Sequence, residues 1–144
     1  VVLMHAKGAP ADMQDDPRYG DVVLDVYDFL AQKVEFAVAA GIPRDRIVID
    51  PGIGFGKTQY HNLALIRALS VFHGVGCPVL LGASRKRFIG VISGADDPQA
   101  RLPGSLAVAQ CAVAQGAKIL RVHDVGETRA ALALWRAVNV GDAG

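Results

Sequence analysis

Residues 46–57 read Arg-Ile-Val-Ile-Asp-Pro-Gly-Ile-Gly-Phe-Gly-Lys, an apolar run that ends at an acid and then enters a glycine-rich loop. The run, residues 46–50, has about the length of a strand and is nearly continuous in apolar residues. That pattern is typical of parallel strands that are buried on both faces. Similar runs occupy residues 1–5, 78–82 and 118–123. The sequence therefore predicts four buried strands.

Longer segments with helical spacing separate these runs. Residues 21–40 place apolar side chains near the i, i+3, i+4 and i+7 positions, and Gly41 followed by Pro43 ends the helix. Further helices are expected over about residues 62–73, 104–115 and 127–138, with a short extra helix over residues 87–92. Strands and helices alternate in this order, which predicts a parallel sheet with right-handed crossovers.

The positions of the polar residues help to choose between two α/β folds. Polar groups follow every apolar run, and they are His5, Asp50, Ser84 to Lys86, and Arg121 with His123. A doubly wound sheet and a barrel both place sites at strand ends, but a barrel draws residues from each successive strand. We therefore expect a TIM (β/α)8 barrel. Such a barrel needs about 250 residues, so four βα units in residues 1–144 supply one domain that is half a barrel.

The composition excludes several classes of protein. The formal net charge is +1, and residues 85–87 form a basic cluster too short for a nucleic-acid patch, so no nucleic-acid partner is expected. There is no apolar stretch of about 18 residues, so no membrane span is expected. Cys77 and Cys111 lie in apolar stretches outside any Cys-x-x-Cys pair, which favours buried free thiols in a reducing cytosol over a disulfide.

The glycine-rich segment 50–57 does not match the common phosphate-binding motifs. It misses both the Walker A spacing and the dinucleotide Gly-x-Gly-x-x-Gly fingerprint by one residue. Its glycines would let the backbone approach a ligand, Phe55 could stack on it, and Asp50 could accept paired N–H donors such as those of an aminopyrimidine ring. The alternative is a tight turn that Asp50 caps.

Residues 82–90 read Gly-Ala-Ser-Arg-Lys-Arg-Phe-Ile-Gly and place three cations after a buried strand. Lys86 could donate to a ring carbonyl or a phosphate, and Ser84 with the following helix N-terminus could bind an anion. The alternative is a solvated basic turn. Because three cations cannot share one pocket, at least one is expected to face solvent.

Residues 121–124 read Arg-Val-His-Asp, and in a strand Arg121 and His123 share a face. An Arg and a His in this arrangement suit a pyrophosphate or a carboxylate. The alternative is an ion pair between Arg121 and a neighbouring acid such as Asp124. A single histidine at position 5 is more often structural than catalytic. No His, Cys, Asp or Glu grouping has metal-ligand spacing, so no metal is predicted from these residues.

Together these segments resemble the dihydropteroate synthase family. The matching pieces occur in family order and are Val2-Leu-Met-His5 with Gly8, Asp50 to Lys57, Ser84-Arg-Lys86 with Phe88-Ile-Gly90, and Arg121-Val-His-Asp-Val125. The resemblance implies a cytoplasmic, sulfonamide-targeted enzyme of folate synthesis. Such an enzyme condenses p-aminobenzoate with 6-hydroxymethyl-7,8-dihydropterin pyrophosphate, which gives 7,8-dihydropteroate and pyrophosphate.

The resemblance also implies a role for each matching residue. Asp50 is expected to hold the aminopyrimidine edge of the pterin, and Lys86 to meet the pterin carbonyl. The walls and floor of the pterin pocket are expected from Met4, Phe55 and Gly82, and the pyrophosphate site from Arg121 and His123. The p-aminobenzoate side is expected from Ser84, Lys86 and Arg87, with Phe88 supporting the Lys86 loop.

One residue departs from the family pattern and half of the pattern has no counterpart. Arg87 stands where many relatives have Ser beside the p-aminobenzoate carboxylate, so that contact falls to a backbone N–H or to Arg87 itself. The resemblance places this chain in the carboxyl-terminal half of the barrel. The amino half would carry the Asn that binds Mg²⁺, two catalytic loops, and a further Asp and Asn of the pterin pocket. The chain alone is therefore expected to lack turnover, and the full-length protein to be a homodimer.

Two other functions stay open at this point. A pterin-binding methyltransferase domain shares the barrel and the Asp-bearing pocket, but it uses a methyl-carrying folate and a corrinoid partner. The cations at positions 86 and 121, with Ser84 and His123, favour pyrophosphate chemistry instead. A non-catalytic half-barrel that self-associates is the third reading, because four βα units leave two open strand edges.

Overall fold

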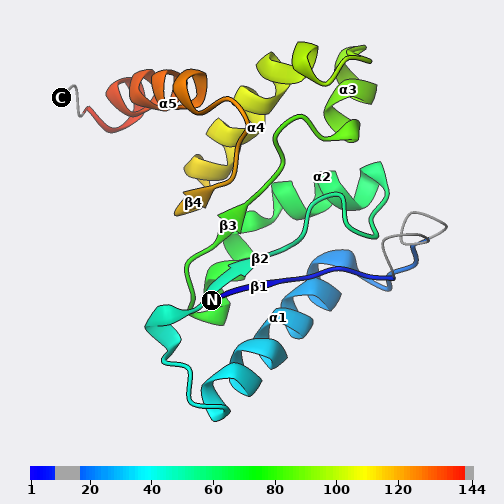
Figure 1. The fold of residues 1–144 in the computed structure, drawn as a ribbon, viewed down its shortest axis with the longest axis vertical. Helices are drawn as coiled ribbons and strands as arrows, with labels where there is room; N and C mark the ends of the chain where they lie inside the picture. Colours follow the sequence, from blue (N-terminus) through cyan, green and yellow to red (C-terminus); the bar gives the residue numbers. More distant parts are fainter. Residues whose placement is uncertain (9–16, 142–144) are drawn as a thin grey trace.

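The computed structural model describes residues 1–8 and 17–141, and an alternation of strands and helices runs through them (Figure 1). The strands are β1 (Val2–Met4), β2 (Val48–Asp50), β3 (Leu80–Leu81) and β4 (Ile119–Leu120). The α-helices are α1 (Val22–Ala39), α2 (Gln59–Arg67), α3 (Arg87–Ser93), α4 (Leu102–Ala114) and α5 (Val125–Val140). Short 3-10 turns are η1 (Arg44–Arg46), η2 (Leu69–Val75) and η3 (Gln99–Arg101).

The strands are parallel and follow one another in chain order. β1 pairs with β2, where Met4 lies opposite Asp50, and β3 pairs with β4, where Leu81 lies opposite Leu120. A parallel bridge between Ile49 and Val79 connects the two pairs. This order confirms the predicted parallel sheet, and it brings the carboxyl ends of all four strands to one edge.

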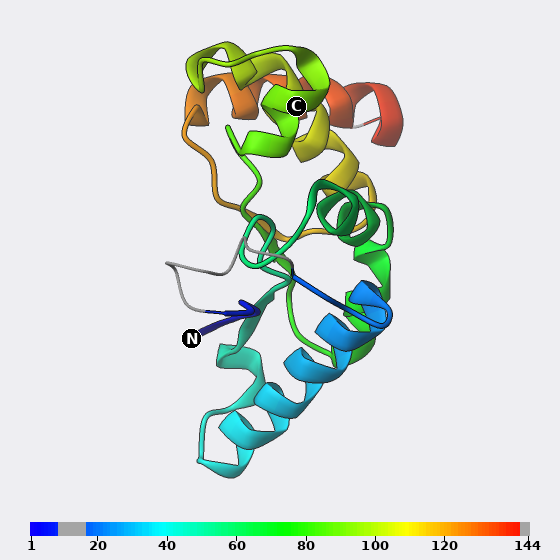
Figure 2. The same ribbon diagram turned by 90° about the vertical axis from the view of Figure 1, so that its right-hand side faces the viewer.

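Helices cover one face of the strands. Figure 2 shows α1 and α2 on the same side of β1 and β2. Val26, Leu30 and Val34 recur on one face of α1 and are fully buried, as the predicted spacing requires. Full burial of a side chain such as Leu30 contributes about 1.5–3 kcal/mol. On the opposite face of β1, Met4 is 37% exposed, so this face is open at the end of the strand.

The predicted helix over residues 62–73 divides into two pieces. Thr58 caps α2 through a capping box, so the helix begins earlier, at Gln59. Helix α2 ends at Arg67. The 3-10 turn η2 follows and ends at Gly76, which has a φ of +78°. The break arises because 3-10 geometry turns Leu69, Phe72 and Val75 to the same side, where all three are buried.

The burial predicted for the two cysteines is confirmed at one position and wrong at the other. Cys77 is buried and free, whereas Cys111 is free but exposed, so its predicted burial is wrong. The reason lies in the register of α4, which turns Ser105, Ala109 and Ala112 inward and leaves position 111 outside. Within residues 1–8 and 17–141, no helix combines the length and apolar character needed to cross a membrane.

Candidate active site

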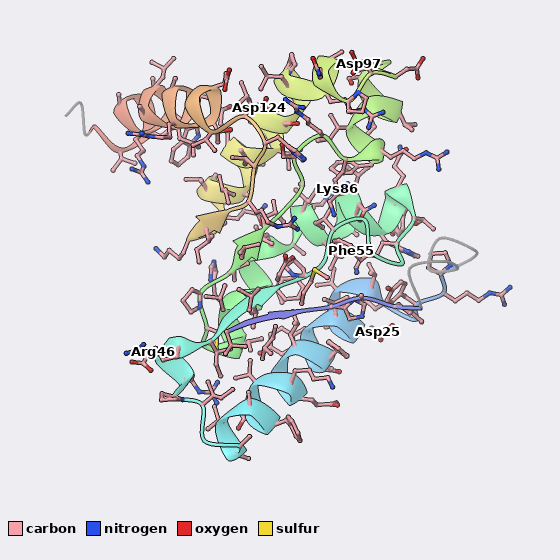
Figure 3. The ribbon with its side chains drawn as sticks, in the orientation of Figure 1. Asp25, Arg46, Phe55, Lys86, Asp97 and Asp124 are labelled. Atoms are coloured by element: carbon pink, nitrogen blue, oxygen red, sulfur yellow. The ribbon has the colours of Figure 1, made fainter. Side chains whose placement is uncertain are left out.

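The predicted site residues lie at or after the carboxyl ends of the strands, and Figure 3 shows two of them, Phe55 and Lys86, near one another. The His5 amide donates to the Asp50 carbonyl at 3.0 Å, and the Arg121 amide donates to the Leu81 carbonyl at 3.0 Å. Backbone pairing therefore fixes β1 against β2 and β4 against β3 at the level of the site. Two loops leave this edge of the sheet. We call residues 50–57 the glycine loop and residues 82–87 the arginine loop.

Asp50 lies at the mouth of the glycine loop and is 3% exposed. Its Oδ1 accepts a hydrogen bond from the Gly52 amide at 2.7 Å. This is the contact that the capped-turn alternative predicts. Burial raises the pKa of Asp50, and the Gly52 hydrogen bond and the cations Arg121, Lys86 and Lys57 oppose that rise. A buried carboxylate surrounded by cations is suited to binding a polar ligand with paired N–H donors.

The glycine loop needs its glycines because it passes close to other backbone. Gly52 has a φ of +71°, and a Cβ there would lie 1.8 Å from the His5 carbonyl oxygen. A Cβ at Gly56 would lie 2.2 Å from the Lys7 carbonyl oxygen. These glycines therefore let the loop fold back over the end of β1, where only a hydrogen side chain fits.

Lys57 is a site residue that the sequence patterns did not single out. It is 3% exposed, and its Nζ donates to the Phe55 carbonyl at 2.9 Å and lies 2.9 Å from Nδ1 of His5. Burial lowers the pKa of Lys57 to about 7. Burial, and then the charge of Lys57, lowers the pKa of His5 to about 4, so His5 is neutral at pH 7 and its Nδ1 accepts from Lys57.

His5 is thus a buried hydrogen-bond partner, in line with the structural role favoured for it. The signal for Lys57 was present in the sequence, since this cation closes the glycine loop directly after a buried strand. The loop matches no phosphate-binding motif, and so the sequence patterns assign no role to its lysine.

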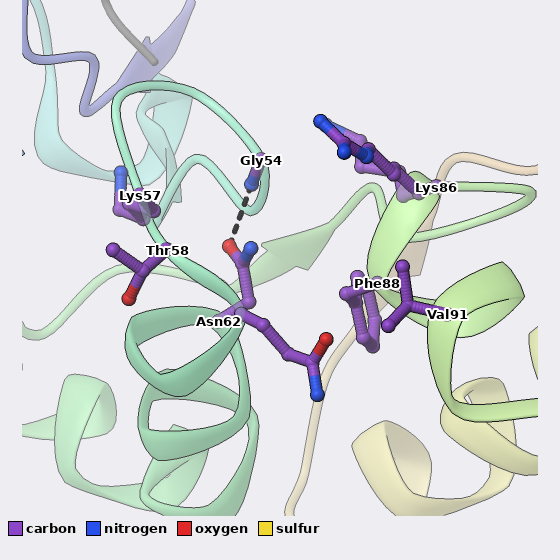
Figure 4. Close-up of a pocket in the computed structure, with 9 residues that line it drawn as sticks. Gly54, Lys57, Thr58, Asn62, Lys86, Phe88 and Val91 are labelled. Atoms are coloured by element: carbon purple, nitrogen blue, oxygen red, sulfur yellow. Dashed lines mark hydrogen bonds between the residues drawn. The ribbon is translucent and has the colours of Figure 1, made fainter. Parts of the chain in front are cut away.

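Lys86 points from the arginine loop toward the glycine loop (Figure 4). Its Nζ donates to the Ile53 carbonyl and lies 4.0 Å from the centroid of the Phe55 ring, a cation–π distance. Burial, and then the charge of Arg121, lowers the pKa of Lys86 to about 8, while Asp50 opposes the shift. The solvated-turn alternative is therefore wrong for Lys86. It holds for Arg87, which is exposed, as was expected for at least one of the three cations.

A cavity of about 560 Å³ lies between the two loops and the helices that follow them (Figure 4). Asn62 of α2 supports one wall, because its Oδ1 accepts from the Gly54 amide at 2.7 Å. Phe88, expected to support the Lys86 loop, is buried at the start of α3. The lining residues are Gly54, Lys57, Thr58, Gln59, Asn62, Lys86, Arg87, Phe88 and Val91.

The residues after β4 join the site through the arginine loop. A Cβ at Gly82 would lie 2.6 Å from Nη2 of Arg121, so the glycine makes room for the guanidinium. His123 is held by Ser84, whose Oγ lies 3.0 Å from Nδ1 and 3.3 Å from the His123 amide. Asp124 pairs with Arg85 and not with Arg121, so the alternative of an Arg121–Asp124 ion pair is wrong.

The described residues do not fit a magnesium ion, the metal that the family resemblance implies. Mg²⁺ takes oxygen ligands in octahedral geometry. Among the buried side chains of the described ranges, Asp50 is the one carboxylate, and its neighbours are the cations Lys57, Lys86 and Arg121. The described part of the chain contains no group of three or more His, Cys, Asp or Glu side chains that could hold a metal ion.

Comparisons with known proteins give the same picture of the fold. A family model described as "Pterin binding enzyme" matches residues 1–123. A dihydropteroate synthase from Neisseria meningitidis serogroup C is 47% identical over 141 residues, an alignment that covers 97% of this chain and 50% of the relative.

Two solved structures match at similar levels. The crystal structure of dihydropteroate synthase from Stenotrophomonas maltophilia has a TM-score of 0.94 and 45% identity, and the match covers 98% of this chain and 53% of that one. The enzyme from Xanthomonas albilineans, in complex with 7,8-dihydropteroate, has a TM-score of 0.87 and 45% identity over 95% of this chain and 49% of that one. The chain spans about half the length of the relatives that it matches.

Proposed function

Because this chain belongs to the pterin-binding enzyme family, we propose that the protein containing it is a dihydropteroate synthase. The reaction joins p-aminobenzoate to 6-hydroxymethyl-7,8-dihydropterin pyrophosphate and releases pyrophosphate. The same membership confirms the predicted fold class, since the structural neighbours are barrels of this family and the chain corresponds to half of one. The identity with synthases sets aside the methyltransferase alternative.

One observation carries the proposal: Asp50 is a buried carboxylate that faces Lys57, Lys86 and Arg121. Its oxygens would accept the paired N–H donors of the pterin's aminopyrimidine edge. Lys86 would donate to the pterin carbonyl. Met4, Phe55 and Gly82 would then provide the walls and floor of the pterin pocket.

The charges around Asp50 suit the chemistry of the condensation. When the carbon–oxygen bond to pyrophosphate breaks, its electron pair leaves with the pyrophosphate and positive charge develops on the electron-rich pterin. A carboxylate held beside the ring stabilises that charge. Arg121 and His123 would bind the departing anion. The aniline nitrogen of p-aminobenzoate then bonds to the methylene carbon and releases a proton.

The substrate p-aminobenzoate would lie on the side of the site where the cavity opens. Ser84, Lys86 and Arg87 are proposed for this side, and Lys86 and Arg87 line the cavity. We further propose that the intact enzyme works in the cytoplasm as a homodimer. It would use Mg²⁺, whose Asn ligand the family resemblance assigns to the amino half of the barrel; the described residues of this chain do not fit the ion.

The test is formation of 7,8-dihydropteroate by the intact protein, supplied with pterin pyrophosphate, p-aminobenzoate and Mg²⁺. Turnover is expected, and Asp50→Ala and Lys86→Ala are each expected to remove most of it. The 144-residue chain alone is expected to be inactive, because its matches cover only half of each related synthase. An intact protein that binds both substrates without forming dihydropteroate would contradict the proposal.

A further inference from the structure

Arg85 has a backbone conformation that side chains rarely adopt. Its φ is +57°, and it is the one non-glycine residue with a positive φ in the described ranges. In this left-handed region the Cβ approaches the carbonyl oxygen, so the conformation persists only when the surroundings hold it. Arg85 lies between Ser84 and Lys86, so its conformation sets the direction in which Lys86 leaves the loop.

Four contacts hold Arg85 in place. Its guanidinium forms a two-pronged ion pair with Asp124, in which Nε donates to Oδ2 at 3.0 Å and Nη2 donates to Oδ1. Its amide donates to Oγ of Ser105 at 2.9 Å, and its carbonyl accepts from Nη1 of Arg101 at 3.0 Å. The Asp124 side chain is only 13% exposed, and the Arg85 guanidinium holds the pKa of Asp124 below its ordinary value.

The partner of Arg85 is itself fixed at the start of α5. The Asp124 carbonyl accepts from the Thr128 amide at 3.0 Å and from Oγ1 of Thr128 at 2.7 Å, and Thr128 is buried. Two consecutive residues of the arginine loop therefore bind two consecutive residues after β4. Ser84 contacts His123, and Arg85 pairs with Asp124.

We propose that Arg85 and Asp124 form a positioning pair, which keeps the backbone of Arg85 left-handed and so aims Lys86 into the site. The same pair fixes the segment that carries His123 beside the arginine loop. Its contribution to turnover rests on the proposed function, in which Lys86 and His123 meet the pterin and the pyrophosphate. Neither Arg85 nor Asp124 needs to touch a substrate for this role.

Glycine at position 85 separates the backbone role from any direct role of the guanidinium. Arg85→Ala and Asp124→Asn both leave a side chain in the strained conformation without its ion pair, so each is expected to lower kcat/KM for pterin pyrophosphate by about 5- to 30-fold. Arg85→Gly loses the same guanidinium but adopts positive φ freely, so it is expected to stay within about threefold of the parent. Adding Asp124→Asn to Arg85→Gly should cost little more.

The controls use the intact protein and a matched ion pair. Glu35→Gln removes the carboxylate partner of Arg44, an Arg–carboxylate pair away from the site, and is expected to leave all constants unchanged. If Arg85→Gly is as impaired as Arg85→Ala, the guanidinium acts directly and the proposal is overturned. If Asp124→Asn has no effect on kcat/KM, the pair does not position Lys86, and the proposal is again overturned.

Crystal structures of the variants decide the inference even if the intact protein makes no dihydropteroate, an outcome that would remove only the proposed function. In Asp124→Asn, residue 85 is expected to leave the left-handed region and Nζ of Lys86 to leave the Ile53 carbonyl. In Arg85→Gly, the backbone and Lys86 are expected to stay as they are. An Asp124→Asn structure with both features unchanged would contradict the proposal.

Discussion

The glycine loop and the arginine loop both turn sharply after a buried strand, and they do so by different means. The glycine loop reaches positive φ at residues that carry no Cβ, and its shape follows from local backbone freedom. The arginine loop reaches positive φ at Arg85, where an ion pair to Asp124, 39 residues further along the chain, holds the conformation. One turn is encoded locally and the other depends on the assembled fold.

This difference separates the ways in which the two loops can fail. A side chain added at Gly52 or Gly56 meets the backbone of the segment that directly follows β1. A side chain removed from the arginine loop takes away a distant partner and leaves the backbone free to relax. Side chains added at Gly52 or Gly56 are therefore expected to act on stability, and loss of the Arg85 side chain mainly on the position of Lys86.

The largest effect is expected for Gly52→Ala. Its Cβ would lie 1.8 Å from the His5 carbonyl oxygen at a φ of +71°, so both backbone strain and overlap oppose it. The free energy of unfolding of the intact protein, measured by urea titration, should fall by about 3 kcal/mol or more. The matched control is Gly41→Ala, with a φ of +94° but no atom within 4 Å, which should cost about 1 kcal/mol. Equal costs at the two positions would show that crowding does not shape the glycine loop.

The next effect is expected for Asp50→Asn, which keeps the size of the side chain and removes its charge. If the carboxylate stabilises positive charge on the pterin, kcat should fall by about 100-fold or more. The exposed Asp45 of η1 offers the control Asp45→Asn, which should leave kcat unchanged. A change confined to KM would mean that Asp50 binds the pterin without stabilising the charge that develops on it.

Lys57 is expected to make the free energy of unfolding depend on pH. Burial lowers its pKa to about 7 in the folded protein, while the unfolded chain titrates near the ordinary 10.5. Between pH 7 and pH 10.5 the unfolded chain binds more protons at Lys57 than the folded protein does. The free energy of unfolding therefore rises with pH in this range, by up to about 1.4 kcal/mol per pH unit. Below pH 7 Lys57 adds no dependence on pH. Lys57→Met should remove this part of the slope in urea titrations from pH 7 to 10. An unchanged slope in the variant would place the titrating group elsewhere.

The smallest effect is expected at Arg87, the exposed cation of the arginine loop. An exposed charge pair contributes at most about 1 kcal/mol, so Arg87→Ser should raise KM for p-aminobenzoate by no more than about fivefold. KM for pterin pyrophosphate should stay the same, since Arg87 is not among the cations that act on Asp50. A large loss of pterin affinity would mean that Arg87 turns into the site when ligand binds.

The sequence was informative wherever the structure is determined locally. The four strands, the face of α1 that carries Leu30, and the gathering of Asp50 and Lys86 at the strand ends all follow from periodicity and order. The positive φ of Arg85 does not, because nothing in residues 82–87 distinguishes it from its neighbours until Asp124 is in contact. The contact of Lys57 with His5 likewise appears only in the fold, because the two residues lie 52 positions apart in the sequence.

The most direct test of the whole account asks whether the site is divided between two ligands. Equilibrium binding of 6-hydroxymethylpterin and of pyrophosphate would be measured by titration calorimetry on the intact protein, Asp50→Asn and Arg121→Ala. Asp50→Asn is expected to lose pterin affinity and to keep pyrophosphate affinity, and Arg121→Ala is expected to show the reverse. If both variants lose affinity for the same ligand, or if neither loses affinity for either ligand, the assignment of Asp50 to the pterin and Arg121 to the pyrophosphate is wrong.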